Sequence, residues 1–188
     1  MNALRVAFVL LTLPLCAGLA LAESPPVAKP GPEHERLGYF VGSWKMDGEV
    51  KENPFMPAGT FKGTESCKWF EGGFALVCKS EGQGPAGPTK SLAIMGYSIE
   101  EKIYTYYVVE NSPMTMTKAA RGTLQDGTFV YDDESTFGGK MVRSRYTIAK
   151  LSPDSYSIKG EVMGPDGSWT TMMEGTSKKK DKEKEKDR

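Results

Sequence analysis

Glu65 is the polar residue whose type and position most clearly suggest a functional role. It lies in a segment in which alternate residues would share one face of a strand. Every second side chain of a strand shares a face, so Glu65 shares one with Phe61, Gly63, Cys67 and Trp69. If that face is interior, the carboxylate must be hydrogen-bonded, paired or protonated, because an isolated buried charge is costly. A bulge near Gly63 would instead turn Glu65 outward, since glycines inside strands often mark bulges. Both fates are open from the sequence alone.

Two arginines, Arg143 and Arg145, are the cations that such a carboxylate or a ligand would meet. They share one face of a strand, and the opposite face carries Val142, Ser144, Tyr146 and Ile148. Charged side chains are seldom buried without a partner, so we expect both guanidinium groups to face solvent.

Cys67 and Cys78 flank a predicted hairpin. A two-residue turn at Gly72-Gly73 places them opposite each other, and strict alternation from that turn predicts a hydrogen-bonded pair with α-carbons about 5.5 Å apart. That separation permits a disulfide, and an exported chain favours a disulfide over metal binding or catalysis. Closing the loop would stabilise the fold by about 3 kcal/mol on the chain-entropy account. Two free buried thiols are the alternative.

Several reaction classes lack the residues that they need. His34 is the only histidine, and without a second histidine at zinc-protease spacing we interpret it as an ordinary surface residue. Haem binding, histidine-based zinc and a serine triad therefore have little support, and no nucleophile elbow or phosphate-binding loop occurs. The run Asp132-Asp133-Glu134 lacks the spacing of a calcium loop and reads as a solvated strand end. We expect no metal, no cofactor and binding rather than catalysis.

The elements that position these residues are mainly strands. Trp44, Met46 and Val50 alternate with charged residues, which predicts a half-buried strand. Before it, Leu37 and Phe40 fall at helical spacing and predict a short helix over 33–41. Turn signals then recur about every 10 to 12 residues and predict ten strands, near 43–51, 59–70, 74–81, 91–99, 102–110, 114–124, 128–135, 141–149, 156–163 and 168–176. Short connections indicate an all-β, antiparallel, up-and-down barrel, whose closure removes the sheet edges.

Residues 1–22 have the pattern of a secretory signal peptide: Arg5, an apolar run that ends at Leu15, and a small-residue site that ends at Ala22. A retained membrane anchor is the alternative, but the apolar run is short and Pro14 interrupts it. Cys16 raises the question of lipid attachment, which Leu15 before it disfavours. We predict an exported protein, periplasmic or extracellular, whose mature chain begins at Glu23.

The rest of the chain suits one domain. A proline-rich linker is predicted over 23–32, the barrel domain over 33–176, and a charged, disordered tail over 177–188. The formal net charge is zero, and the body is mildly acidic while the tail is slightly basic. This distribution argues against a nucleic-acid partner. We expect no transmembrane segment, and the sequence does not indicate an oligomeric state.

Four short motifs carry a resemblance to a known family. They are the apolar helix that ends in Tyr39-Phe40-Val41-Gly42-Ser43-Trp44, the hairpin Trp69-Phe70-Glu71-Gly72-Gly73-Phe74, the strand segment Gly96-Tyr97-Ser98, and Trp169 in the last strand. Over about residues 33–175 the chain resembles an uncharacterised bacterial domain-of-unknown-function family, thought to be lipocalin-like within the calycin group of barrels. The resemblance implies a barrel that holds an interior ligand, with no assigned activity. It also implies an arginine beside Trp44, for which Arg143 or Arg145 would serve.

Strands rich in aromatic residues and methionine either fill a core or line an adaptable pocket. We predict binding of a small apolar or amphipathic molecule, such as a fatty acid, inside the barrel. The alternative is an envelope interaction or structural module whose barrel is filled, and an enzyme is a third hypothesis. The candidate ligand-binding residues are Trp44, Met46, Glu65, Trp69, Arg143, Arg145 and Trp169.

Overall fold

A computed structural model describes residues 29–112 and 116–180 of the chain. A short α-helix and a 3-10 helix precede ten strands, as the repeated turn signals predicted. The elements are α1 (Pro32–Glu35), η1 (Arg36–Phe40), β1 (Gly42–Val50), β2 (Gly59–Trp69), β3 (Ala75–Gly84), β4 (Gly87–Ser98), β5 (Ile103–Glu110), β6 (Ala120–Gln125), β7 (Thr128–Phe137), β8 (Lys140–Ser152), β9 (Ser155–Met163) and β10 (Trp169–Lys179). Within these described ranges, no helix is long and apolar enough to cross a membrane.

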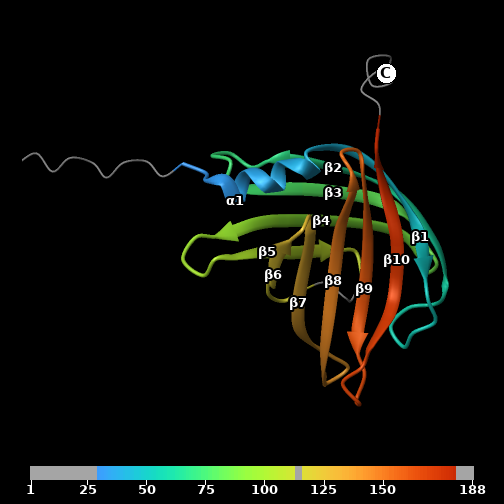
Figure 1. Ribbon diagram of the computed structural model, residues 1–188. Helices are drawn as coiled ribbons and strands as arrows, with labels where there is room; N and C mark the ends of the chain where they lie inside the picture. The colour runs from blue at the N-terminus through green and yellow to red at the C-terminus, as the bar shows by residue number, and fades with distance from the viewer. Residues whose placement is uncertain (1–28, 113–115, 181–188) are drawn as a thin grey trace, which may run out of the picture.

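The ten strands form one closed antiparallel barrel (Figure 1). Each strand pairs with its neighbours in sequence, and β1 closes the sheet by pairing with β10. The predicted up-and-down barrel is therefore confirmed. In Figure 1 the helix lies at one end of the barrel, and the β1–β2, β7–β8 and β9–β10 connections lie toward the opposite end. We call these the helix end and the mouth.

The alternation in β1 decides which face is interior. Trp44 is fully buried and Val50 nearly so, while Lys45, Asp47 and Glu49 are exposed. By the same alternation, position 48 faces inward. It is a glycine because the strands approach closely there: an added Cβ would lie 2.3 Å from the Glu174 carbonyl oxygen and 2.6 Å from the Phe61 ring. A larger residue at this point would force the β1–β10 pair apart.

The helix end is covered by α1 and η1. Leu37 and Phe40 are buried against the core, and the Trp44 indole Nε1–H donates to the Phe40 carbonyl at 2.8 Å. The prediction that His34 is a surface residue is wrong, because its side chain is 2% exposed. The Gly31 N–H donates to its Nδ1, and its ring meets the edges of Phe74 and Tyr97. The imidazole ring of His34 is therefore part of the helical cover of the barrel, and it is packed against aromatic rings.

Element ends differ from the prediction in two informative places. The predicted helix is mostly a 3-10 helix, over Arg36–Phe40. The last strand continues three residues past its predicted end at 176, because Ser177 is a buried position opposite Met46 of β1 and Tyr156 of β9. The charged tail predicted from 177 therefore overlaps the barrel, and residues 181–188 lie outside the described residues, as does the signal peptide.

The disulfide between Cys67 and Cys78 is present, and its predicted pairing is confirmed. Its expected backbone spacing is wrong: the two α-carbons are 4.0 Å apart, nearer the narrow, non-hydrogen-bonded spacing. The cause is the turn, in which the Phe70 N–H donates to the Ala75 carbonyl around a four-residue loop. The last hydrogen-bonded pair before the loop is thus one residue pair farther from the turn than a two-residue loop would give. The residue partners stay the same, but hydrogen-bonded and non-hydrogen-bonded pairs exchange places along the hairpin. The sulfurs lie on the inner face.

Candidate functional site

The side chain of Glu65 lies inside the barrel, and its carboxylate is hydrogen-bonded there. Glu65 faces inward, because β2 pairs with β1 and β3 in continuous register and Glu65 lies opposite Trp44 and Ser80. The Ser80 hydroxyl donates to Glu65 Oε2 at 2.9 Å, and the Tyr156 hydroxyl donates to Oε1 at 3.0 Å. Of the two fates open from the sequence, the structure has the inward one.

Burial decides the protonation of this group and its neighbours. It raises the pKa of Glu65, and the hydrogen bonds from Ser80 and Tyr156 offset part of that rise. Burial also raises the pKa values of Tyr156 and Tyr106, and the nearby Glu65 carboxylate raises both further. The tyrosine hydroxyls therefore keep their protons over the physiological pH range and act as hydrogen-bond donors.

Glu65 also lies beside the disulfide. Its carboxylate oxygen and the sulfurs of Cys67 and Cys78 lie within 4.8 Å of one another. Such a trio would suit a soft metal ion if the sulfurs were thiolates. Because both sulfurs are joined in the disulfide, this group does not form a metal site.

The helix end of the interior is filled by stacked and edge-on aromatic rings. The Trp44 and Tyr156 ring centroids are 4.9 Å apart, and Phe40 meets both Tyr156 and Phe129 at about the same spacing, 5.4 and 5.5 Å. Tyr104 closes the group at 5.1 Å from Phe129. These rings pack together as part of the core between the helix and Glu65.

The mouth end is different, because it contains a cavity of about 60 Å³. Six apolar or aromatic side chains line it, together with Asp133 and four residues that carry hydroxyl groups, Thr117, Ser135, Thr136 and Ser144. We call this space the mouth cavity, and its principal lining residues are Phe55, Met116, Asp133, Phe137, Ser144, Tyr146 and Met172. It would hold a few water molecules or one small chemical group.

Asp133 is the unusual residue of the mouth cavity. It is only 7% exposed, and no group among the described residues hydrogen-bonds its Oδ1. Burial raises the pKa of Asp133, and the charge of the exposed Lys118 nearby, together with hydrogen bonds to the carboxylate from the Ser135 hydroxyl and the Glu134 backbone, offsets part of the rise. The interpretation of Asp132-Asp133-Glu134 as a solvated strand end is therefore wrong for its middle member. The signal was available: Asp133 shares the face of Phe129 and Tyr131.

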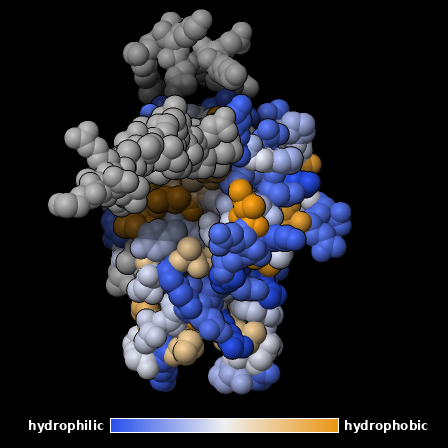
Figure 2. All heavy atoms as spheres, turned by 90° about the vertical axis from the view of Figure 1, so that its left-hand side faces the viewer, coloured by the Kyte–Doolittle hydropathy of each residue, from blue (hydrophilic) through white to orange (hydrophobic). Residues whose placement is uncertain are grey.

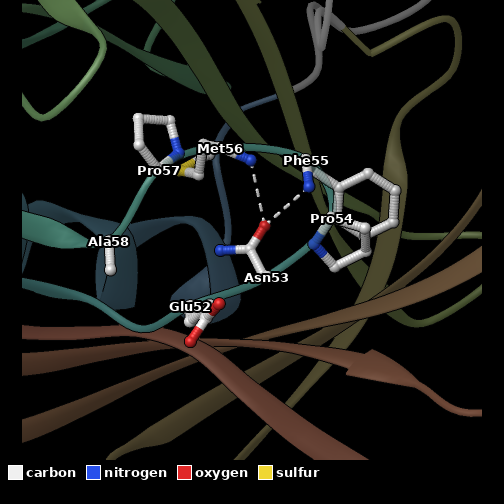
Figure 3. Close-up of a pocket in the computed structure, with 7 residues that line it drawn as sticks. All are labelled: Glu52, Asn53, Pro54, Phe55, Met56, Pro57 and Ala58. Carbon is white, nitrogen blue, oxygen red and sulfur yellow. Dashed lines mark hydrogen bonds between the residues drawn. The ribbon is translucent and has the colours of Figure 1, made fainter.

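The β1–β2 loop covers one side of the mouth cavity. The Asn53 side-chain oxygen accepts hydrogen bonds from the backbone N–H groups of Phe55 and Met56, at 2.9 and 3.1 Å (Figure 3). This turn holds the Phe55 ring edge-on to Phe137, with centroids 5.1 Å apart. The loop itself outlines a shallow depression over residues 52–58, and among the residues that the structure describes this one loop supplies its whole lining.

Three of the predicted site residues lie on the outer surface. Arg145 forms two hydrogen bonds with Asp132 and stacks its guanidinium 4.2 Å from the centre of the Trp169 ring. Arg143 pairs with Glu134 at 2.7 Å. Neither arginine approaches Trp44 in the way that the resemblance implied.

The remaining candidates lie at the helix end or deep in the barrel. The cation over Trp44 is Lys179 of the last strand, 5.2 Å from the ring centre. Trp69 lies beside Gly38 and is 38% exposed. Met46 faces inward and is half-buried. The structure thus brings together Trp44, Met46 and Glu65, and it separates them from the other four candidates.

Sequence reasoning missed most of the interior hydroxyl groups. Tyr106, Tyr131 and Tyr146 come from three strands and meet in the interior, with the Tyr106 centroid 5.3 Å from Tyr131 and 6.1 Å from Tyr146. The Tyr131 hydroxyl is buried and has no hydrogen-bond partner among the described residues. Between Glu65 and the mouth the interior therefore contains phenol and carboxyl groups among apolar side chains such as Met46 and Met172.

Comparison with known proteins places the chain in a family. Residues 29–179 match the family described as protein of unknown function DUF1579, and the chain belongs to it, as the short motifs indicated. Rv2717c from M. tuberculosis is 10% identical, with a TM-score of 0.57 over 80% of this chain and 99% of that one. The S-type phycobiliprotein lyase CPES from Guillardia theta is 15% identical, with a TM-score of 0.50 over 80% of this chain and 93% of that one. These likenesses show the fold alone. Among curated proteins, none matches in sequence.

Proposed function

We propose that this member of the DUF1579 family binds a small amphipathic molecule inside its barrel, with the polar group of the ligand in the mouth cavity. The observation that carries the proposal is the Asp133 Oδ1 atom, which is buried and has no hydrogen-bond partner among the described residues, in a cavity lined by apolar, aromatic and hydroxyl side chains. Pockets for small molecules are typically apolar with a few placed polar groups.

The energetics of burial support a ligand or ordered water at this place. A buried polar atom without a hydrogen bond costs about 1–3 kcal/mol, and more when it is charged. Folded proteins rarely keep such atoms without a reason. Asp133 would lose this cost when a hydrogen-bond donor or a cation enters the mouth cavity.

The size of the mouth cavity limits what enters without movement. At about 60 Å³ it is smaller than the roughly 150 Å³ cavity that accepts a benzene ring. A head group of a few heavy atoms fits, and a longer ligand requires Phe55 to swing away from Phe137. The Lys51 N–H donates to the Met172 carbonyl of β10, and residues 52–58 of the loop have no strand pairing, so displacement of Phe55 leaves the barrel ladders intact.

An interaction module with a filled barrel is the second candidate. Its support is the set of exposed apolar side chains, which includes Phe70 at 63% and Ile99 at 61%. Figure 2 shows apolar residues in a recessed area of the visible face, with hydrophilic residues and further apolar residues around it. Binding of partners through that surface would not need an unfilled interior.

Export is part of the proposal. The sequence pattern of residues 1–22 and the Cys67–Cys78 disulfide support maturation in an oxidising compartment. Intact mass of the protein purified from its own organism tests the first residue, which we expect to be Glu23.

The test of ligand binding uses the neutral, environment-sensitive probe N-phenyl-1-naphthylamine. We expect saturable fluorescence enhancement with the folded mature protein. Ser144→Leu fills the mouth cavity and should abolish the enhancement, whereas Met141→Leu, at an exposed position of the same strand, should not. Thermal melts of both variants confirm folding. Equal probe binding by wild type and Ser144→Leu would move the assignment to the interaction module.

A further inference from the structure

We propose that the mouth cavity selects an organic cation, a protonated or methylated alkylamine head group, with the Asp133 carboxylate as its counter-ion. This inference rests on the proposed function and names its ligand class. It departs from the fatty acid that the sequence suggested, because a fatty acid carries the opposite charge.

The charges that face the interior support a cation. Asp133 and Glu65 point inward, and Glu110 acts on the same region: Asp133 and Glu110 both add to the effect of burial in raising the pKa of Tyr146. The positive side chains are placed differently. Lys150 and Lys179 lie over aromatic rings at the helix end, and Lys118 is exposed outside the mouth cavity. An entering carboxylate would meet like charge, and an ammonium group would meet unlike charge.

The free acceptor on Asp133 is the second, independent observation. Its Oδ1 is buried, unpartnered among the described residues and part of the mouth-cavity wall. The outer carboxylates of the same strand are already paired, since Asp132 binds Arg145 and Glu134 binds Arg143. Asp133 is thus the carboxylate of β7 that has an acceptor free for a ligand.

The walls suit an alkylated ammonium group more than a hydrated metal ion. Phe55 and Phe137 meet edge-on at the mouth cavity, and the Tyr146 ring also lines it. Aromatic faces attract organic cations, and a quaternary ammonium group is bound in protein sites by aromatic residues around it. Met116 and Met172 add flexible apolar surface for the attached alkyl chain. A metal ion would instead require several oxygen ligands.

The experiment compares ligands that share a ten-carbon chain and differ in head group: decyltrimethylammonium, decylamine, decanol and decanoate. Each is titrated into the full mature protein by calorimetry at neutral pH, below its micelle concentration. We expect the two cations to bind at least about tenfold more tightly than decanol, which is the scale of one charge-assisted contact. Decanoate should bind most weakly.

The variants separate charge from shape. Asp133→Asn should lower the affinity for the two cations to about that for decanol and so remove the preference, while Glu134→Gln, the adjacent outward position, should keep it. Phe55→Leu keeps the apolar surface of the loop and removes the ring, so it should weaken decyltrimethylammonium more than decanol. Because Phe55 is in a loop, this variant tests the proposal even if Asp133→Asn folds poorly.

The outcomes distinguish the two levels of the proposal. If no member of the series binds, the proposed function itself fails. If decanol or decanoate binds as tightly as the cations, or if Asp133→Asn keeps the preference for cations, an interior ligand site stands and the cation assignment is overturned.

Discussion

The Tyr156 hydroxyl donates a hydrogen bond to Glu65 at 3.0 Å, and this bond links β9 to β2, which are separated by β10 and β1 in the barrel. A bond between strands that do not pair fixes the cross-section of the barrel at this level. It also marks where the filled helix end gives way to the hydroxyl-lined part of the interior.

Removal of this bond should destabilise the fold. Tyr156→Phe leaves Glu65 with Ser80 as its remaining donor among those described, and we expect a loss of about 1.5–3 kcal/mol in the free energy of unfolding. Urea denaturation measures it. In a double-mutant cycle with Glu65→Gln, the two losses should be non-additive; additive losses would contradict a direct coupling.

Stability should fall as the pH rises through the mildly acidic range. Burial raises the pKa values of Glu65 and Asp133 in the folded protein. The folded chain then holds protons that the unfolded chain has released above its ordinary carboxyl pKa of about 4. Their stabilising contribution is complete below that pH and is lost as the pH rises through the raised values.

The measurement is the urea midpoint between about pH 4 and 7. Glu65→Gln and Asp133→Asn should each flatten the decline, and Glu134→Gln, outside the barrel, should leave it as in the wild type. An unchanged slope in both interior variants would contradict the raised pKa values.

Loss of the disulfide should cost about 3 kcal/mol, since it closes a loop of 11 residues. Cys67→Ala with Cys78→Ala is the variant, because alanine leaves no buried thiol, and denaturant unfolding is the readout. Thiol titration of the denatured, non-reduced wild type should find no free thiol after removal of the signal peptide. Two titratable thiols would refute the bridge.

Replacement of Arg145 should have little effect on stability or on ligand binding. Arg145→Ala removes a surface pair with Asp132 and the stacking on Trp169; exposed ion pairs contribute about 0–1 kcal/mol. We expect a small change in melting temperature and no change in ligand affinity. A large loss of binding would return Arg145 and Trp169 to the site.

Two truncated chains should distinguish the contribution of β10 to stability from that of the tail. A chain that ends at Lys180 keeps β10 and the hydrogen bond from the Lys180 N–H to the Ser43 carbonyl, so its melting temperature should match that of the full chain. A chain that ends at Thr176 loses the buried Ser177 and the pairing of Lys179 with Trp44. It should melt several degrees lower. Equal melting of the two truncations would contradict the observed end of β10.

The sequence predicted the barrel well because its signals are local. Alternation about Trp44 and glycine-rich turns determine strands, and short turns determine neighbours. The facing of Cys67 and Cys78 followed from the same reasoning, although the turn length, which depends on backbone geometry at Glu71–Phe74, exchanged wide and narrow pairs.

The site was less predictable, because the role of an inward-facing residue depends on which side chains from distant strands contact it across the interior of the barrel. Alternation placed Glu65 on one face with Cys67 but left open whether a bulge turns it outward, and it could not show that Tyr156, 91 positions away, completes its hydrogen bonding. Asp133 was hidden by its charged neighbours, Asp132 and Glu134, which suggested a solvated run. Trp169 lies on the outer surface because the register of β10 is irregular between Thr171 and Met173, which reverses the facing of the residues before it.

The most direct test of the central claim is a titration of ¹⁵N-labelled mature protein with decyltrimethylammonium and, in parallel, with decanol, followed by amide chemical shifts. We predict saturable shifts that concentrate at Phe55, Asp133 and Ser144 around the mouth cavity for both ligands. Absence of saturable shifts with either ligand, or shifts confined to outer positions such as Ile94 and Met141, would contradict an interior binding site.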